Sequence, residues 1–168
     1  MQIKKDKNFF ICCPGTHSKW IKIKNNKIIL FETYLTGDLF SSISNNTILS
    51  KSMSKSGKFS KKYFLFALKA IKENSLSYML FKVRTMNLFN QSNQIESESY
   101  LSGLIIGEEI KNISKKIIKN KVYLISEGKL LKFYLLAFNF FKIEYKILDY
   151  KKAFISGAKE LYLSLIHI

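Results

Sequence analysis

The order of strand-like and helix-like segments is the feature that most constrains how this chain can fold. Short apolar runs with strand character lie at 9–13, 20–24 and 27–34. The last two are joined by Asn25-Asn26, a pair that tolerates the positive φ of a tight turn. Residues 101–163 then alternate between helix and strand patterns. A hairpin followed by such an alternation predicts an α/β fold in which a mixed sheet is covered by helices.

The remaining segments complete a single domain. We expect a short helix at 39–49 after a turn at 36–38, a surface loop at 50–60, a helix at 61–72, an apolar stretch at 76–83 and a polar loop at 87–99. An amphipathic helix is predicted from Leu101 to Ile117, because its apolar residues recur mostly at three- and four-residue spacing. It is followed by a strand at 122–125, a largely buried helix at 130–141, a strand at 143–148 and a helix at 151–163.

The charge of the chain suggests a nucleic-acid partner, but its distribution argues against one. There are 28 basic and 12 acidic residues, which gives a net charge of +16. Arginine occurs once, as Arg84, and the lysines are scattered, so AT-rich coding can explain the excess. We therefore expect no nucleic-acid partner, and a basic module that binds nucleic acid or an anionic surface remains the alternative function.

The apolar runs and the cysteines indicate a cytoplasmic protein. No apolar run reaches the roughly 18–20 residues that a spanning helix needs, so no membrane partner is expected. The five apolar residues from Phe9 to Cys13 are fewer than the roughly 7–15 of a secretion signal. The adjacent Cys12 and Cys13 cannot close an ordinary loop, which fits free thiols in a reducing compartment.

A polar loop follows the first strand and could bind phosphate. Pro14-Gly15 bends the backbone, and small hydroxyl and basic side chains come directly after the bend. An ordinary hairpin turn has the same composition. Lys19 either approaches a phosphate or is solvated, and His17 either faces a cleft or is hydrogen-bonded within its own loop.

Four segments, in order, resemble the bacterial 2-dehydro-3-deoxygalactonokinases. They are the Pro-Gly-Thr-His-Ser-Lys-Trp signature within 13–20, a Thr-Gly-Glu-Leu element within 33–40, a Val-Arg-Thr stretch within 81–89, and a Leu-Ser-Gly-Leu-Leu-Ile-Gly helix within 100–109. Asp38 stands where that family usually has Glu. The resemblance implies one lobe, the C-terminal one, of an actin-like, ribonuclease H-like sugar kinase fold.

The resemblance also implies a reaction and its site. These kinases transfer the γ-phosphoryl group of ATP to the 6-hydroxyl of 2-dehydro-3-deoxy-D-galactonate in galactonate catabolism, with Mg²⁺, so ATP and a sugar acid are the expected small-molecule partners. The implied phosphate-binding residues are Gly15, Thr16, His17, Ser18 and Lys19. The implied adenosine-side residues are Ser126, Glu127 and Gly128, in a unit of residues 121–157 whose last helix is entered near Gly157. Ser126 replaces a usual Gly.

Further residues have two possible roles each. Thr36, Gly37, Asp38 and Arg84 are candidates for contacts to substrate or to a magnesium-bound water, and no direct metal ligand is expected. Asp38 could instead stabilise the start of the following helix, and Arg84 could form a structural salt bridge. Gly103 and Gly107, four residues apart, are expected to permit close helix packing at the floor of the cleft.

The resemblance covers only the C-terminal half of the longer family members. Residues 1–162 are therefore expected to form the C-terminal lobe. A missing N-terminal lobe would carry the first phosphate loop, most of the sugar site and the catalytic base. Phosphoryl transfer depends on convergent groups, so we expect the fragment to be inactive alone or to work only when that lobe is supplied separately. The last residues, 163–168, match a translated sequencing adapter and are expected to be an artefact.

Overall fold

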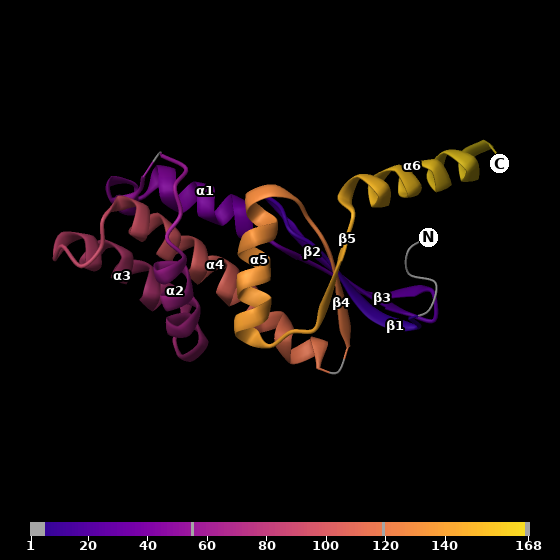
Figure 1. The fold of residues 1–168 in the computed structure, drawn as a ribbon, viewed down its shortest axis with the longest axis horizontal. Coiled ribbons are helices and arrows are strands. Elements are labelled where there is room, and N and C mark those ends of the chain that lie inside the picture. The colour runs from indigo at the N-terminus through magenta and orange to yellow at the C-terminus, as the bar shows by residue number, and fades with distance from the viewer. Residues whose placement is uncertain (1–5, 55, 119, 167–168) are drawn as a thin grey trace.

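The computed structural model describes residues 6–54, 56–118 and 120–166 and has the alternating order that the sequence predicts (Figure 1). Its strands are β1 (Asn8–Cys13), β2 (Ser18–Lys24), β3 (Lys27–Tyr34), β4 (Lys121–Ile125) and β5 (Tyr145–Leu148). Its helices are α1 (Thr36–Asn46), the 3-10 helix η1 (Ile48–Ser52), α2 (Lys61–Glu73), α3 (Leu76–Leu88), α4 (Gln94–Ile117), α5 (Gly128–Phe141) and α6 (Tyr150–Ile166).

The strands form one mixed sheet in the order β3-β2-β1-β4-β5. β1, β2 and β3 are antiparallel neighbours, and β4 and β5 run parallel to β1. Asn25 and Asn26 have φ of 49° and 61°, as the tight turn between β2 and β3 requires. The predicted α/β architecture with a mixed sheet is confirmed.

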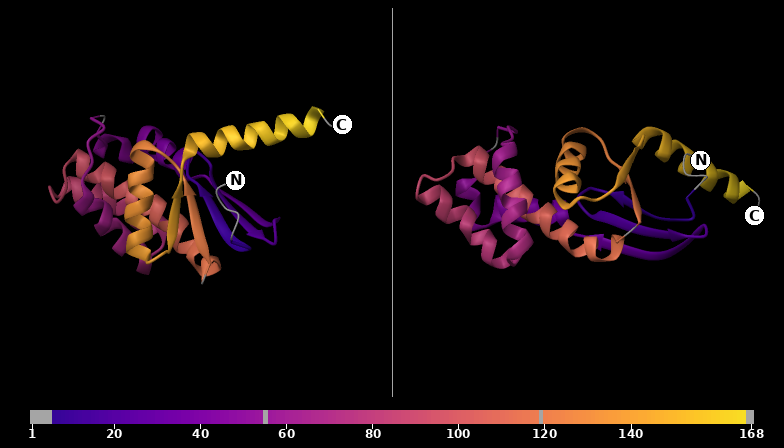
Figure 2. Two further views of the ribbon diagram at one scale, coloured as in Figure 1. Left: turned by 45° about the vertical axis from the view of Figure 1, so that its right-hand side comes forward. Right: turned by 60° about the horizontal axis from the view of Figure 1, so that its bottom comes forward.

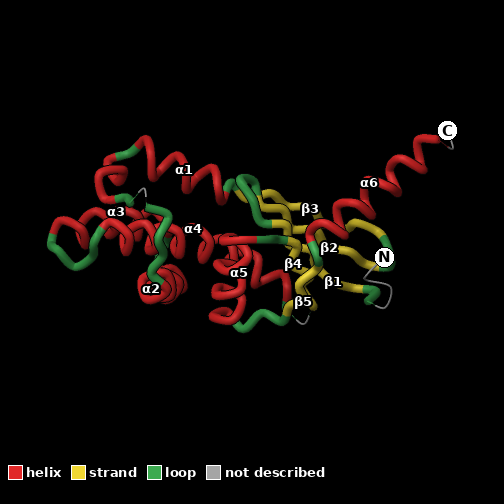
Figure 3. The backbone as a smooth tube through the Cα atoms, turned by 45° about the horizontal axis from the view of Figure 1, so that its top comes forward, coloured by secondary structure: helices red, strands yellow, loops and turns green. Residues whose placement is uncertain are grey.

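The long helix α4 joins the sheet to a separate group of helices (Figure 3). Its C-terminal half carries Ile106, Ile110 and Ile113 into a core shared with α5 and one face of the sheet. Its N-terminal half carries Leu101 and Leu104 into a second core formed with α1, α2 and α3. Because one helix contributes to both cores, it fixes the sheet relative to the helical group.

The start of α4 differs from the sequence-based prediction. Residues 87–99 were expected to be a loop, but α3 continues to Leu88 and α4 already begins at Gln94. Asn93 accepts a hydrogen bond from the N–H of Glu96, and the Glu96 carboxylate accepts one from the N–H of Asn93. This capping box starts the helix, and small serines on its buried side make the segment look loop-like in sequence.

Other boundaries also need correction. Residues 36–38 form the first turn of α1 and do not end the hairpin, and α5 is only partly buried, through Tyr134, Ala137 and Phe138. β5 begins two residues later than expected, at Tyr145. Gly157 lies in the middle of α6, so this helix is not entered there.

The sheet is covered by α4 and α5 on one face, whereas α6 extends away from it (Figure 2). The opposite face carries a smaller cluster of Phe9, Tyr123 and Leu148. Residues 167 and 168, at the end of the segment expected to be an artefact, lie outside the described residues. Across the part of the chain that the structure describes, no helix is both long enough and apolar enough to cross a membrane.

Candidate functional site

A cavity of about 260 Å³ lies between the loop after β1, the middle of α4 and the start of α5. Its lining residues are Gly15, Thr36, Gly37, Phe40, Lys58, Phe59, Glu98, Ser99, Ser102, Ile105, Ile106, Lys129, Leu130 and Phe133. Most of the wall surface is apolar, with two lysines and one carboxylate among the polar groups. Such a wall suits a flat, largely apolar group that is oriented by a few polar contacts.

The loop after β1 rests directly on the first turn of α1. The N–H groups of Gly37 and Asp38 both donate to the carbonyl oxygen of Thr16, each at 3.0 Å. A Cβ at Gly37 would lie 2.7 Å from the Cα of Thr16, so only glycine allows this approach. The strand end and the helix start therefore hold the Gly15-Thr16 turn at the mouth of the cavity.

Behind this loop lies a buried carboxylate, Glu109 of α4, which is 2% exposed. Its Oε1 accepts a hydrogen bond from Trp20 Nε1 at 2.7 Å. Its Oε2 accepts from the Tyr134 hydroxyl at 2.7 Å and from the Thr36 hydroxyl. The Tyr134 hydroxyl is also 2.8 Å from Ser18 Oγ. Glu109 thereby connects β2, α1 and α5 at the base of the loop.

Burial controls the protonation of this group of side chains. It raises the pKa of Glu109, and hydrogen bonds from Thr36, Trp20 and Tyr134 oppose that rise. Burial also raises the pKa of the Tyr134 hydroxyl and of the Cys12 thiol well above their usual values, and the nearby Glu109 raises them further. Tyr134 and Cys12 are therefore neutral, so any charge among these buried side chains is carried by Glu109.

The outer side of the loop is open to solvent. His17 Nε2 lies 3.7 Å from Asp38 Oδ2, and both side chains are about half exposed, at 50% and 53%. Lys19 Nζ donates to the carbonyl oxygen of His17 at 2.8 Å. No group of three or more His, Cys, Asp or Glu side chains within the described ranges is placed to hold a metal ion. Asp38 is thus a single exposed carboxylate beside the loop.

The comparison with known families shows to which family the chain belongs. The sequence profile of the 2-keto-3-deoxy-galactonokinase family matches residues 1–161. The chain belongs to this galactonokinase family. The protein assigned as 2-dehydro-3-deoxygalactonokinase DgoK1 of Rhizobium meliloti is 35% identical to it over 104 residues, which is 60% of the chain. The 2-dehydro-3-deoxygalactonokinase of Escherichia coli is 24% identical over 100 residues, also 60% of the chain.

A solved galactonokinase structure shares the fold. A crystal structure from Sinorhizobium meliloti, assigned as a 2-dehydro-3-deoxygalactonokinase, matches 94% of this chain with a TM-score of 0.87 and 27% identity. The match covers 54% of that chain, and each curated relative is covered over 34% of its length. The present chain therefore spans about half or less of these relatives.

Only part of the site expected from the galactonokinase resemblance lines the cavity. Gly15, Thr36 and Gly37 line it, whereas Ser18 points inward to the Glu109 pocket. Thr16, His17 and Asp38 are exposed and Lys19 is half-buried, and none of the four lines the cavity. Ser126, Glu127 and Gly128 lie just before the cavity-lining Lys129 at the start of α5.

The other expected residues lie elsewhere. Gly103 and Gly107 face α2, because a Cβ at either would come within 2.6 Å of atoms of that helix. Arg84 lies on α3, does not line the cavity and forms no ion pair with another described residue.

Several residues of the site did not emerge from the sequence. The aromatic walls Phe59 and Phe133 come from segments 74 positions apart, so no local pattern joins them. Glu109 could have been recognised from the sequence. It lies four residues after Ile105 and four before Ile113, on the apolar face of α4. A charge at such a position is buried and must be satisfied by hydrogen bonds.

Proposed function

We propose that this chain forms the nucleotide-binding lobe of an ATP-dependent 2-dehydro-3-deoxygalactonokinase. In that reaction the γ-phosphoryl group of ATP is transferred to the 6-hydroxyl of 2-dehydro-3-deoxy-D-galactonate. The observation that carries the proposal is the cavity that ends at Gly15, the glycine of the loop after β1. An apolar chamber next to a glycine loop and a helix start is the arrangement that a nucleotide needs.

The walls of the cavity have the aromatic and apolar surface that an adenosine group would contact. Phe59 and Phe133 lie with ring centroids 4.6 Å apart, which gives a continuous aromatic surface along one side. Ile105 and Leu130 supply further apolar contact. Lys129 is held near the rim, since its Nζ donates to the carbonyl oxygen of Gly57 at 3.1 Å.

The loop after β1 has the features needed to bind the phosphates of the same ligand. Around Gly15 there is open space, because a Cβ placed there would meet no atom within 4 Å. Backbone N–H groups of a tight turn form a concave anion site, and the exposed Thr16 hydroxyl can add a donor. Asp38 could hold Mg²⁺ through a water beside this turn, and the ion would neutralise charge on the phosphates.

The relatives that this chain matches are longer, and we propose that their remaining half supplies the groups that are missing here. Residues 1–162 would then act as the C-terminal lobe, with the sugar site and the catalytic base on an N-terminal lobe. Because phosphoryl transfer requires both sets of groups around one phosphate, the chain would bind nucleotide but not turn over sugar acid alone.

Replacement of Gly15 by alanine should weaken ATP binding and leave the fold unchanged. The open space around Gly15 accepts a methyl group without a clash, so the free energy of unfolding should stay within about 0.5 kcal/mol of wild type. The same methyl group would occupy the space proposed for a phosphate, so we expect an affinity loss of about tenfold, or 1.4 kcal/mol. Titration calorimetry with ATP, together with urea unfolding, measures both quantities.

The control for this variant is Gly157→Ala on the exposed helix α6, which should change ATP affinity little. Unchanged ATP affinity in a folded Gly15→Ala protein would contradict the placement of the phosphates.

A further inference from the structure

The buried carboxylate of Glu109 is connected to the loop proposed to bind phosphate. Each side chain that donates a hydrogen bond to it lies next to that loop in sequence, contacts a residue that does, or precedes a residue that contacts the loop. Trp20 and Ser18 lie on β2 directly after that loop, and Thr36 precedes Gly37, whose N–H holds Thr16. Tyr134 links Ser18 to Glu109 from the α5 side. Each of these groups is buried, so the contacts are shielded from water.

Glu109 also fixes the direction of these hydrogen bonds. The hydrogen bonds that Glu109 receives favour its ionised form, which only accepts, and the single hydroxyl hydrogen of Tyr134 is donated to its Oε2. Ser18 must therefore donate to the Tyr134 oxygen across their 2.8 Å contact. The oxygen of Ser18 is left to accept from the N–H of Gly15, which lies 3.4 Å away. The donors thus point inward, in series, from Gly15 to Glu109.

We propose that Glu109 is a positioning residue that sets the conformation of the phosphate-binding turn through Ser18, Tyr134, Thr36 and Trp20. This rests on the proposed function, since it assigns the turn to the phosphates of ATP. Bonds to an ionised acceptor are about twice as strong as neutral ones, so the carboxylate holds the turn more firmly than an amide would. Glu109 itself lies behind the loop and does not line the cavity.

The variant Glu109→Gln tests this with almost no change in size. Trp20 Nε1 can only donate, so the amide oxygen must face it and the NH₂ group must face Thr36 and Tyr134. These hydroxyls can accept from the NH₂ group instead, so each oxygen keeps a hydrogen bond, although the Thr36 hydroxyl and one hydroxyl of the Ser18–Tyr134 pair lose the acceptor for their hydrogen. The fold should therefore persist while the turn loses its charged anchor.

The decisive readout compares ATP with adenosine, which fills the cavity but has no phosphates. In calorimetry we expect Glu109→Gln to bind ATP about tenfold more weakly than wild type and adenosine equally well. Glu108→Gln is the matched control, because Glu108 is the neighbouring carboxylate on α4 and pairs only with Lys111 and Asn112 among the described residues. It should change neither affinity.

Each other outcome has a distinct meaning. Equal loss of ATP and adenosine affinity would show a purely structural role for Glu109 and overturn the proposal, as would no loss of either. If wild type binds neither ligand, the proposed function itself fails.

A measurement on the wild-type protein covers the case in which the variant does not fold. Trp20 is the single tryptophan, so one indole N–H resonance reports on its bond to Glu109. Saturating ATP should shift this resonance, whereas saturating adenosine should leave it in place. If the indole resonance responds to both ligands alike, or to neither, phosphate binding is not coupled to the Glu109 carboxylate, and the proposal is overturned.

Discussion

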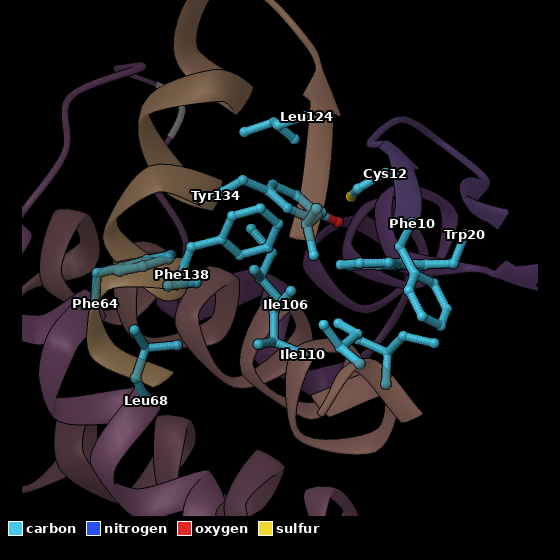
Figure 4. Close-up of a cluster of buried hydrophobic side chains, with 14 residues drawn as sticks. Phe10, Cys12, Trp20, Phe64, Leu68, Ile106, Ile110, Leu124, Tyr134 and Phe138 are labelled. Atoms are coloured by element: carbon cyan, nitrogen blue, oxygen red, sulfur yellow. The ribbon is translucent and has the colours of Figure 1, made fainter. Parts of the chain in front are cut away.

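Replacing Trp20 by alanine should lower the free energy of unfolding by about 3–5 kcal/mol, the usual loss for a large aromatic side chain in a core. The indole is fully buried on β2 and packs against Phe138 of α5, with ring centroids 6.0 Å apart (Figure 4). Its removal leaves a cavity between the sheet and α5. It also removes the donor that satisfies Glu109 Oε1, so a buried carboxylate oxygen loses its partner.

A second substitution separates these two contributions. Trp20→Phe keeps most of the ring volume but has no N–H, so it should cost about 1–3 kcal/mol, the range for an unsatisfied buried acceptor. Urea unfolding followed by circular dichroism gives both values. Equal stabilities for Trp20→Ala and wild type would show that the β2–α5 core is not packed as described.

Replacing Gly103 by valine should be similarly severe, with a loss of about 3 kcal/mol or more from overpacking. A Cβ at this position would lie 2.6 Å from the carbonyl oxygen of Phe64 and 2.7 Å from the Cβ of Ala67. Both belong to α2, and the first is backbone, so the two helices must move apart. That movement would disturb both cores, because α4 takes part in each.

Gly157→Val is the matched control for this prediction. It places the same side chain in the middle of a helix, α6, where a Cβ meets no atom within 4 Å. Valine has a better helix propensity than glycine, so stability should be unchanged or slightly higher. Thermal unfolding compares the two variants, and an equal effect of both would contradict the close contact between α2 and α4.

The sequence predicts each strand to within two residues and the start of α2 at Lys61, but it misses the starts of α1 and α4. β3 was expected at 27–34 and has these bounds, because an apolar run between Asn25-Asn26 and the following polar residues has few alternatives. The first turn of α1 was missed since Thr36-Gly37-Asp38 has the composition of a turn. In the structure this glycine is needed for the approach of the loop, and the helix nevertheless begins there.

The candidate site was predictable only where its residues are close in sequence. The loop around Gly15 stands out through its Pro-Gly bend, and the family resemblance joins it to Thr36 and Gly37. The cavity itself depends on tertiary packing, since Phe59 precedes α2 and Phe133 belongs to α5. The partners of Glu109 come from three different elements, so no spacing rule could have connected them.

Photolabelling with 8-azido-ATP tests the central claim, that the cavity beside Gly15 binds the nucleotide. The wild-type chain is irradiated with the probe, and the labelled peptides are identified by mass spectrometry with and without excess ATP. The account predicts labelling that ATP suppresses, on the peptides that carry Phe59 or the start of α5 at Lys129 and Phe133. Labelling that ATP does not suppress, or that falls only on distant segments such as α3 or α6, would contradict it.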